Sequence, residues 1–310
     1  MLTLRDIRKR YETRRILEGV SFSMGEGQKM ALVGANGVGK STLLKIIAGE
    51  ETYDRGEMVK VNRILVGYLP QEALALSGKE TFIEYLERMA GVGEAREHME
   101  RLSLSLDRPE KLAEYEEWQK VFERLGGYQF RQRARGILEG LALSHIREES
   151  PLEQLSGGER RKAALAGVLL RGVDLLLLDE PTNNLDLPAL LWLERYLTKT
   201  KAACLIASHD RQFLDTVVSR VIELDVLTRK ATLYAGGWTE YAAMKAHQVR
   251  KYLEEYRAQE AEKARVLESS EEKREWADIG AKQVMPDNDH MSQGYHRDRS
   301  ERKLGTQAKT

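Results

Sequence analysis

The chain has 310 residues, which is enough for one large domain or two modest ones. Its formal net charge is zero, so bulk charge gives no argument for binding to nucleic acid or to an anionic membrane. No apolar run approaches the ~20 residues that a membrane-spanning helix needs, and the N-terminus MLTLRDIRKR lacks the apolar core of a signal peptide. The single cysteine, Cys204, cannot form an internal disulfide, and we expect a soluble cytoplasmic protein.

Residues 1 to about 75 alternate short β-rich runs with turns, and one helix interrupts them between Lys40 and Gly49. From about 81 to 135 charged residues dominate, and leucine, tyrosine and methionine recur at helical spacing. This pattern predicts a helical insert, in which Pro109 favours a turn or a helix start.

From residue 151 to 225 helical stretches alternate with short apolar runs such as DLLLLD and AACLIAS. Buried strands that alternate with helices indicate a mostly parallel sheet covered on both faces, so the predicted fold class is α/β. Beyond about Met244 a charged helix follows, with a thin apolar seam of Val249, Leu253, Tyr256 and Leu267. Pro286 and its polar neighbours break this helix, and the last stretch, HRDRSERKLGTQAKT, is locally basic.

Residues 34–41 read GANGVGKS, between the apolar run KMALVG and a predicted helix. This is the phosphate-binding pattern G-x-x-x-x-G-K-S, in which glycines let the backbone wrap closely so that N–H groups point at phosphate oxygens. Lys40 adds a positive charge near the β and γ phosphates, Ser41 offers a hydroxyl to magnesium, and Thr42 offers another to a phosphate. The residues predicted to bind the nucleotide here are Gly34, Ala35, Asn36, Gly37, Val38, Gly39, Lys40, Ser41 and Thr42.

Two adjacent acids, Asp179 and Glu180, follow the apolar run LLLL. Ligands are expected at the carboxyl ends of strands in an open α/β sheet. Asp179 can hold magnesium and Glu180 can polarise an attacking water. On their own the acids could be an exposed strand end without a role, but together with the phosphate loop they indicate a phosphoryl-transfer site.

Three further pieces give the chain its resemblance to ATP-binding cassette (ABC) proteins: LSGGE at residues 155–159, Gln71 in GYLPQE, and His209 in IASHD. The order of all these motifs, with Asp186 after the acids, is the order of that family. The resemblance implies a cassette fold with an antiparallel β subdomain and a helical subdomain, and ATP and Mg²⁺ as its ligands.

The resemblance also implies a role for each matching residue. Lys40, Glu180 and His209 are expected to be catalytic, and Ser41, Gln71 and Asp179 are expected to coordinate the metal. Further nucleotide contacts are expected from Tyr11, which would stack on adenine, and from Ser156, Gly157, Gly158 and Asp186. In the family, the LSGGE helix of a different cassette closes over the γ-phosphate, so a second cassette is an expected partner.

The pair Asn183–Asn184 and the stretch YAGGWTEYAAMKA are similar to the ABC-F subfamily, soluble twin-cassette proteins that act on ribosomes, although Gly237 and Trp238 depart from its usual pattern. The resemblance implies a cassette over 1–245 with an arm insert at about 81–135, and a helical inter-cassette linker over 246–310. Only one cassette is present, so we expect the chain to correspond to the N-terminal half of a longer protein.

The leading expectation is thus an ATP-hydrolysing ABC-F translation factor or antibiotic-resistance ribosome-protection protein, with ribosomal RNA or tRNA as partners and no membrane. For RNA contact the basic tail, with Arg297, Arg299, Arg302 and Lys303, is a better candidate than the arm, where Glu114, Glu116 and Glu117 cluster. Two alternatives stay open: the energising subunit of a membrane transporter, and a nucleotide-dependent scaffold without useful catalysis.

Overall fold

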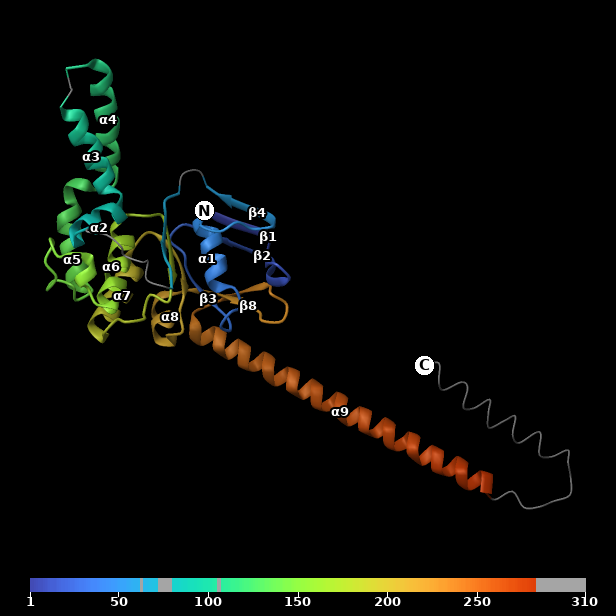
Figure 1. The fold of residues 1–310 in the computed structure, drawn as a ribbon. Coiled ribbons are helices and arrows are strands. Elements are labelled where there is room, and N and C mark those ends of the chain that lie inside the picture. Colours follow the sequence, from blue (N-terminus) through green and yellow to red (C-terminus); the bar gives the residue numbers. More distant parts are fainter. Residues whose placement is uncertain (62–63, 72–79, 105–106, 283–310) are drawn as a thin grey trace, which may run out of the picture. The chain divides into compact units, whose positions relative to one another are not determined.

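The structure, a computed structural model, describes residues 1–61, 64–71, 80–104 and 107–282, with side chains as far as residue 266 (Figure 1). Contacts divide the chain into two compact units, Met1–Lys245 and Ala246–Thr310. The first unit holds every residue predicted for the nucleotide site. Within the described residues no helix combines the length and the apolar character needed to cross a bilayer.

A small antiparallel sheet forms the N-terminal part of the first unit. It contains β1 (Leu2–Tyr11), β2 (Arg14–Met24) and β4 (Arg55–Lys60) in the order β2-β1-β4. Leu2 and Leu4 alternate with more exposed residues along β1 and are buried, as expected for a strand with one covered face. Strands β1 and β2 are joined by two residues only, which makes them a tight hairpin.

The larger sheet has six strands in the order β5-β6-β7-β3-β8-β9. The strands are β3 (Lys29–Val33), β5 (Val66–Leu69), β6 (Leu175–Asp179), β7 (Ala203–Ala207), β8 (Arg220–Leu224) and β9 (Ala231–Ala235). Pairing is parallel from β5 to β8 and antiparallel between β8 and β9. The predicted mostly parallel sheet is confirmed, while the sequence analysis did not anticipate β9.

Both faces of this sheet are covered, because alternate residues of β6 and β7 belong to two different hydrophobic clusters. Leu176 and Leu178 pack in the cluster that includes helices α6 (Gly157–Leu170), α7 (Leu187–Lys199) and α8 (Arg211–Val217). Leu175 and Leu177 pack on the opposite side with α1 (Lys40–Ala48) and with β1 and β2. These four helices lie where the sequence predicted them.

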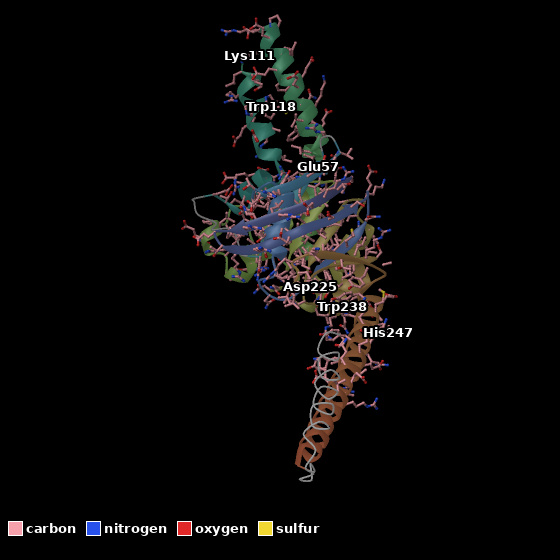
Figure 2. The ribbon with its side chains drawn as sticks, turned by 90° about the vertical axis from the view of Figure 1, so that its right-hand side faces the viewer. Glu57, Lys111, Trp118, Asp225, Trp238 and His247 are labelled. Carbon is pink, nitrogen blue, oxygen red and sulfur yellow. The ribbon has the colours of Figure 1, made fainter. Side chains whose placement is uncertain are left out.

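The described part of the segment between β5 and α6 is mostly helical, and helices lie where the sequence predicted them, at about 81–135. It contains α2 (Phe82–Ala90), α3 (Val92–Ser103), α4 (Pro109–Arg124) and α5 (Phe130–Gly140), and two short 3₁₀ turns lie at Gly127–Gln129 and Leu152–Gln154. Helices α3 and α4 lie side by side, and α2 packs on α6. Figure 2 shows Lys111 toward the outer end of this pair and Trp118 nearer the sheets, where Trp118 stacks on His98 with ring centroids 3.9 Å apart.

The charged C-terminal helix, α9, runs from Trp238 to Lys282 and so begins earlier than the sequence suggested. Its residues from Ala246 onward belong to the second unit. Val249, Leu253 and Tyr256 of the predicted seam are exposed. The side chain of Leu267, the helix-breaking stretch at Pro286 and the basic tail with Arg297, Arg299, Arg302 and Lys303 lie outside the described residues.

Candidate nucleotide-binding site

The predicted phosphate loop connects the buried strand β3 to α1. Gly34, Gly37 and Gly39 have φ of 151°, 72° and 113°, in the region that L side chains rarely adopt. A Cβ on Gly34 would lie 2.7 Å from the carbonyl oxygen of Leu224, and one on Gly39 would lie 2.9 Å from Cγ2 of Ile16. Only glycine fits these two positions, so the loop is held close to the strands beside it.

No side chain caps the N-terminus of α1, because its N-cap residue is Gly39. Uncapped N–H groups and the helix dipole make this end suitable for an anion. Lys40 Nζ donates to the carbonyl oxygen of Gly34 at 2.8 Å and lies 3.4 Å from that of Ala35, so its side chain curls back along the loop. Burial lowers the pKa of Lys40, and the carboxylates of Glu180 and Asp179 oppose that shift.

The predicted acid pair lies at the carboxyl end of β6 and is buried. Burial raises the pKa of Asp179, against the influence of the Ser41 hydroxyl and of Lys40. Asp179 Oδ2 and Glu180 Oε1 are buried, and neither finds a hydrogen-bond partner in the described part of the chain. Such unsatisfied oxygens are costly, so this pair is arranged for a ligand that is not part of the protein.

Glu180 has a positive φ of 52°, and its N–H donates to the carbonyl oxygen of Ala207 on β7 at 2.7 Å. Its carboxylate accepts a hydrogen bond from the N–H of His209 at 3.3 Å, and Nε2 of His209 lies 3.4 Å from Oε1. That second contact is an ion pair only when His209 is protonated. Burial raises the pKa of Glu180, and the neighbouring Asp179 adds to the shift while His209 opposes it.

One cavity of about 630 Å³ collects most of the predicted residues. Its predicted lining residues are Tyr11, Asn36, Gly37, Gly39, Lys40, Ser41, Thr42, Gln71, Asp179, Glu180 and His209. A smaller cavity of about 320 Å³ shares Lys40 and His209 with it and is also lined by Gly34 and Ala35. The parallel strands thus bring together, at one edge, residues that are far apart in the sequence.

Some predicted residues lie elsewhere. Val38 is buried, and its N–H donates to the carbonyl oxygen of Ala35 at 3.2 Å, so it supports the loop from within. Asp186 is the N-cap of α7, where it accepts from the N–H of Ala189 at 3.3 Å, and it lies 3.6 Å from Nζ of Lys162. Neither Val38 nor Asp186 lines the cavity.

The LSGGE segment also lies outside the cavity, at the start of α6. Ser156 is the N-cap, and it forms a capping box with Glu159. Glu159 in turn lies 2.8 Å from Nε2 of His145. A Cβ would meet nothing within 4 Å at Gly157, and only the side chain of Asn184, at 3.9 Å, at Gly158. The tip of this helix is therefore open on the outside.

Sequence reasoning missed three residues that line the main cavity: Arg14, Ile16 and Asn183. A signal for Arg14 was present, because only two residues separate it from Tyr11. A two-residue hairpin loop places its flanking residues opposite each other, and the structure pairs Tyr11 with Arg14. Asn183 was singled out only as a family marker and was given no role in the site.

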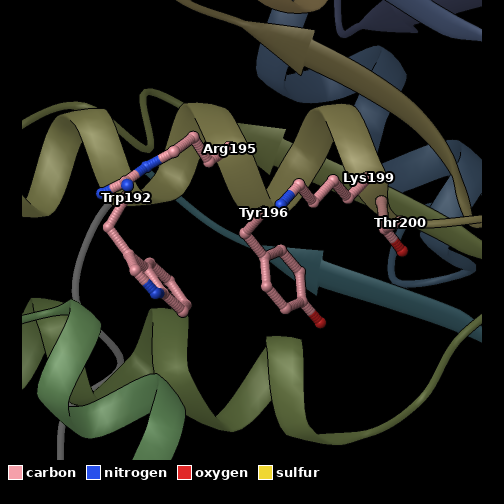
Figure 3. Close-up of a pocket in the computed structure, with 5 residues that line it drawn as sticks. All are labelled: Trp192, Arg195, Tyr196, Lys199 and Thr200. Atoms are coloured by element: carbon pink, nitrogen blue, oxygen red, sulfur yellow. The ribbon is translucent and has the colours of Figure 1, made fainter.

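Another cavity, of about 460 Å³, lies along α7 and contains no predicted site residue (Figure 3). Trp192 and Tyr196 point from α7 toward the helices below it, and their stacked rings have centroids 5.3 Å apart. The hydroxyl of Tyr196 donates to the carbonyl oxygen of Leu169 at 3.1 Å. Arg195, Lys199 and Thr200 complete the lining. These lining residues include no carboxylate or histidine, so this cavity is not suited to phosphoryl transfer.

The residues of the main cavity fit Mg²⁺ and ATP. Within the described residues no group of three or more His, Cys, Asp or Glu side chains converges on a metal site. Mg²⁺ commonly takes one or two carboxylates together with water and substrate phosphates, which suits the buried carboxylate of Asp179 beside Ser41. The glycine loop and Lys40 would hold the phosphates.

Comparisons with known proteins agree with this geometry. The family model described as "ABC transporter" matches residues 17–183, more than half of the chain. The tylosin resistance ATP-binding protein TlrC of Streptomyces fradiae is 35% identical over 82% of this chain. The energy-dependent translational throttle protein EttA of Haemophilus influenzae is 36% identical over 68% of it.

The chain spans 47% of TlrC and 39% of EttA. Among solved structures, an ATP-binding subunit of an ABC transporter superposes with a TM-score of 0.60, at 22% identity, over 76% of this chain and 90% of that one. This likeness concerns the fold. Together, the fold, the glycine loop with its buried acid pair and the match over residues 17–183 show that the chain belongs to the ABC transporter family, as an ATP-binding cassette ATPase whose ligands are ATP and Mg²⁺.

Proposed function

We propose that this chain is one cassette of an ABC-F type, ribosome-associated protein that hydrolyses ATP, either a translation factor or an antibiotic-resistance ribosome-protection protein. The observation that carries the hydrolytic part of the proposal is the buried acid pair at the end of β6, which lines one cavity with the phosphate loop. Each acid keeps one oxygen without a hydrogen-bond partner among the described residues.

Glu180 is the proposed general base. Its raised pKa makes it a stronger proton acceptor than a solvent-exposed glutamate. This suits it to take a proton from water as that water attacks the γ-phosphorus and the bond to the β–γ bridging oxygen breaks, which releases ADP and phosphate. His209 is close enough to orient the Glu180 carboxylate, and its side chain is exposed and lines the cavity, where it is proposed to sense the γ-phosphate. Lys40 and the loop N–H groups neutralise charge on the phosphates.

Magnesium, when bound, would neutralise negative charge on the phosphates. Asp179, Ser41 and Gln71 are the residues proposed to hold it, and all three line the cavity. Tyr11, which lines the same cavity, is proposed to stack on adenine; its hydroxyl donates to Glu51 at 3.1 Å, which restrains the ring.

A second cassette is the proposed partner at this site. Ser156, Gly157 and Gly158 lie on an open helix tip outside this chain's own cavity, so they would act on ATP held by another cassette. Asp186, at the start of α7 and 3.6 Å from Lys162 of α6, is proposed to lie at the same junction. A single chain is then expected to bind ATP and to hydrolyse it slowly unless two copies associate head to tail.

Two observations support the ABC-F assignment over other cassettes. Asn183 and Asn184 follow the acid pair, and Asn183 lines the cavity. The relatives TlrC and EttA are named for tylosin resistance and for translational throttling, respectively. We propose accordingly a cassette over 1–245 with the arm at about 81–135, and a linker over 246–310 that contacts ribosome-bound RNA in the cytoplasm.

The second candidate is the ATPase subunit of a membrane transporter, which the ABC transporter family match and the fold of the transporter subunit favour. Lysate from cells that produce the Glu180→Gln chain, supplied with Mg-ATP, separates the two. ABC-F function predicts recovery with ribosomes in a sucrose cushion, and loss of that recovery when ATP is omitted. Recovery with washed membranes instead would reject the ABC-F proposal in favour of the transporter.

The hydrolytic proposal has its own test. The wild-type chain is examined for ATP turnover together with light scattering, which reports its oligomeric state. Slow turnover by the monomer and faster turnover by a dimer are expected. Brisk turnover by a strictly monomeric chain would contradict the requirement for a second cassette.

A further inference from the structure

The β1–β2 hairpin projects two side chains toward the phosphate loop. Tyr11, the last residue of β1, pairs with Arg14, the first residue of β2. Residues directly opposite each other in an antiparallel pair have their side chains on the same face. Both line the cavity of the phosphate loop, so the end of the hairpin presents an aromatic ring and a guanidinium side by side.

Arg14 differs from the other cations of this hairpin. Arg8, Arg10 and Arg15 all approach the carboxylate of Glu18, at 3.1, 4.0 and 3.9 Å. Lys9 pairs with Glu51 at 2.6 Å. Arg14 forms no ion pair with any described residue and is exposed to the cavity. The next residue along β2, Arg15, has its side chain on the opposite face by strand alternation.

The guanidinium of Arg14 reaches the phosphate loop itself. Its Nη2 lies 3.9 Å from the position that a Cβ would take on Gly37. Because Gly37 has no side chain, the guanidinium can approach the loop backbone directly. Lys40 of the phosphate loop lines the same cavity, so the guanidinium of Arg14 adds a second positive charge beside a loop suited to an anion.

We propose that Arg14 is a nucleotide-binding residue that donates hydrogen bonds to oxygens of the phosphate chain of ATP, while Tyr11 beside it holds the base. Arginine presents several N–H donors in a planar fork that matches phosphate oxygens, and such charge-assisted hydrogen bonds are stronger than neutral ones. The end of the hairpin thereby fixes base and phosphates relative to each other. The assignment depends on the proposed function only in that ATP is the ligand of this cavity.

The test measures the Kd of Mg-ATP by calorimetry for the full chain and three variants. Arg14→Ala is expected to raise the Kd about tenfold, as for loss of a charge-assisted hydrogen bond. Arg14→Lys is expected to recover part of the affinity, because it keeps the charge but not the fork. Arg15→Ala removes the same charge one residue away, on the other face, and is expected to leave the Kd within twofold of wild type.

Two outcomes would overturn the assignment of Arg14 while leaving the nucleotide site itself supported. One is a wild-type chain that binds Mg-ATP while Arg14→Ala binds within twofold of it. The other is an Arg15→Ala variant that loses as much affinity as Arg14→Ala, which would indicate general electrostatic attraction. A wild-type chain that does not bind Mg-ATP would instead overturn the nucleotide site and this assignment together. Should Arg14→Ala fail to fold by circular dichroism, Arg14→Gln, which keeps most of the side chain, replaces it in the same comparison.

Discussion

The acid pair at the end of β6 and the LSGGE tip of α6 are both rich in polar groups, but they differ in burial and in hydrogen bonding. Asp179 and Glu180 are buried, and each keeps an oxygen without a hydrogen-bond partner among the described residues. Ser156 is exposed, and its hydroxyl and N–H are both engaged with Glu159 in a capping box.

The difference separates a site that needs a ligand from one that is stable without it. Burying unpaired carboxylate oxygens costs free energy that a cation or a bound water recovers. A capped and exposed helix tip carries no such cost and remains available to a surface brought by another molecule. One chain would thus hold its nucleotide in the cavity and offer the separate helix tip to a second cassette, as the proposed head-to-tail pairing requires.

The largest effect is expected at the acid pair. Glu180→Gln keeps the size and hydrogen-bonding capacity of the side chain but removes the base, so turnover is expected to fall by about 10²-fold or more while Mg-ATP still binds. Steady-state phosphate release and calorimetry measure the two quantities on the same preparation. Undiminished hydrolysis would remove Glu180 from the role of base.

The phosphate loop can be tested at Gly34, with Gly49, the C-cap of α1, as a control outside the loop that also has a positive φ. Gly34→Ala introduces both a strained φ and a Cβ only 2.7 Å from the carbonyl oxygen of Leu224. It is expected to lower the free energy of unfolding by about 2 kcal/mol or more. Gly49 also has a positive φ, of 87°, but a Cβ added there meets nothing within 4 Å. Gly49→Ala is therefore expected to lower the free energy of unfolding by only about 1 kcal/mol. Equal losses in urea unfolding would show that space around Gly34 is not limiting.

The tip of α6 has a natural control in the N-terminus of α2. Thr81 with Glu84, and Ser156 with Glu159, form the same kind of capping box. Thr81→Ala and Ser156→Ala are each expected to cost about 1 kcal/mol of stability, since each removes an N-cap. Only Ser156→Ala is expected to reduce turnover in a two-cassette assembly, by about tenfold. If both variants reduce turnover equally, stability and not contact with the nucleotide is responsible.

The smallest expected effect concerns the pH dependence of that same cap. Hydrogen bonds from Ser156 and then from His145 lower the pKa of Glu159 from 4.5 to about 2. A carboxylate with a lowered folded-state pKa contributes stability that is complete above its unfolded pKa and is lost as the pH falls between the two values. Between pH 5 and pH 3, Glu159→Gln is therefore expected to lose less stability than wild type. The free energy of unfolding of both proteins is measured in urea at pH 5 and at pH 3. An equal loss in the two proteins would contradict this expectation.

Much of the fold followed from local pattern. Runs such as LLLL and ACLIA have to be buried on both sides, which indicates central parallel strands, and the helices between them have apolar faces and capping residues. Strand β9 escaped prediction because ATLYA is mostly exposed or half-buried and has no continuous apolar run. It is an antiparallel edge strand, and among the described strands it pairs with β8 alone. Its strand state depends on its neighbour more than on its composition.

In the site, too, some features could be predicted from local sequence and others depend on distant neighbours. The sequence by itself determined the chemistry: the glycine loop with Lys40, the acid pair, His209 and the LSGGE cap are readable because each requires particular residue types at fixed short spacings. Only the tertiary structure decided which of these share a cavity, placing Arg14 and Asn183 among them and leaving Ser156 and Asp186 outside. The physical reason is that contacts between strands distant in sequence depend on their order in the sheet and their register, and these are set by packing of the whole core and not by any short stretch.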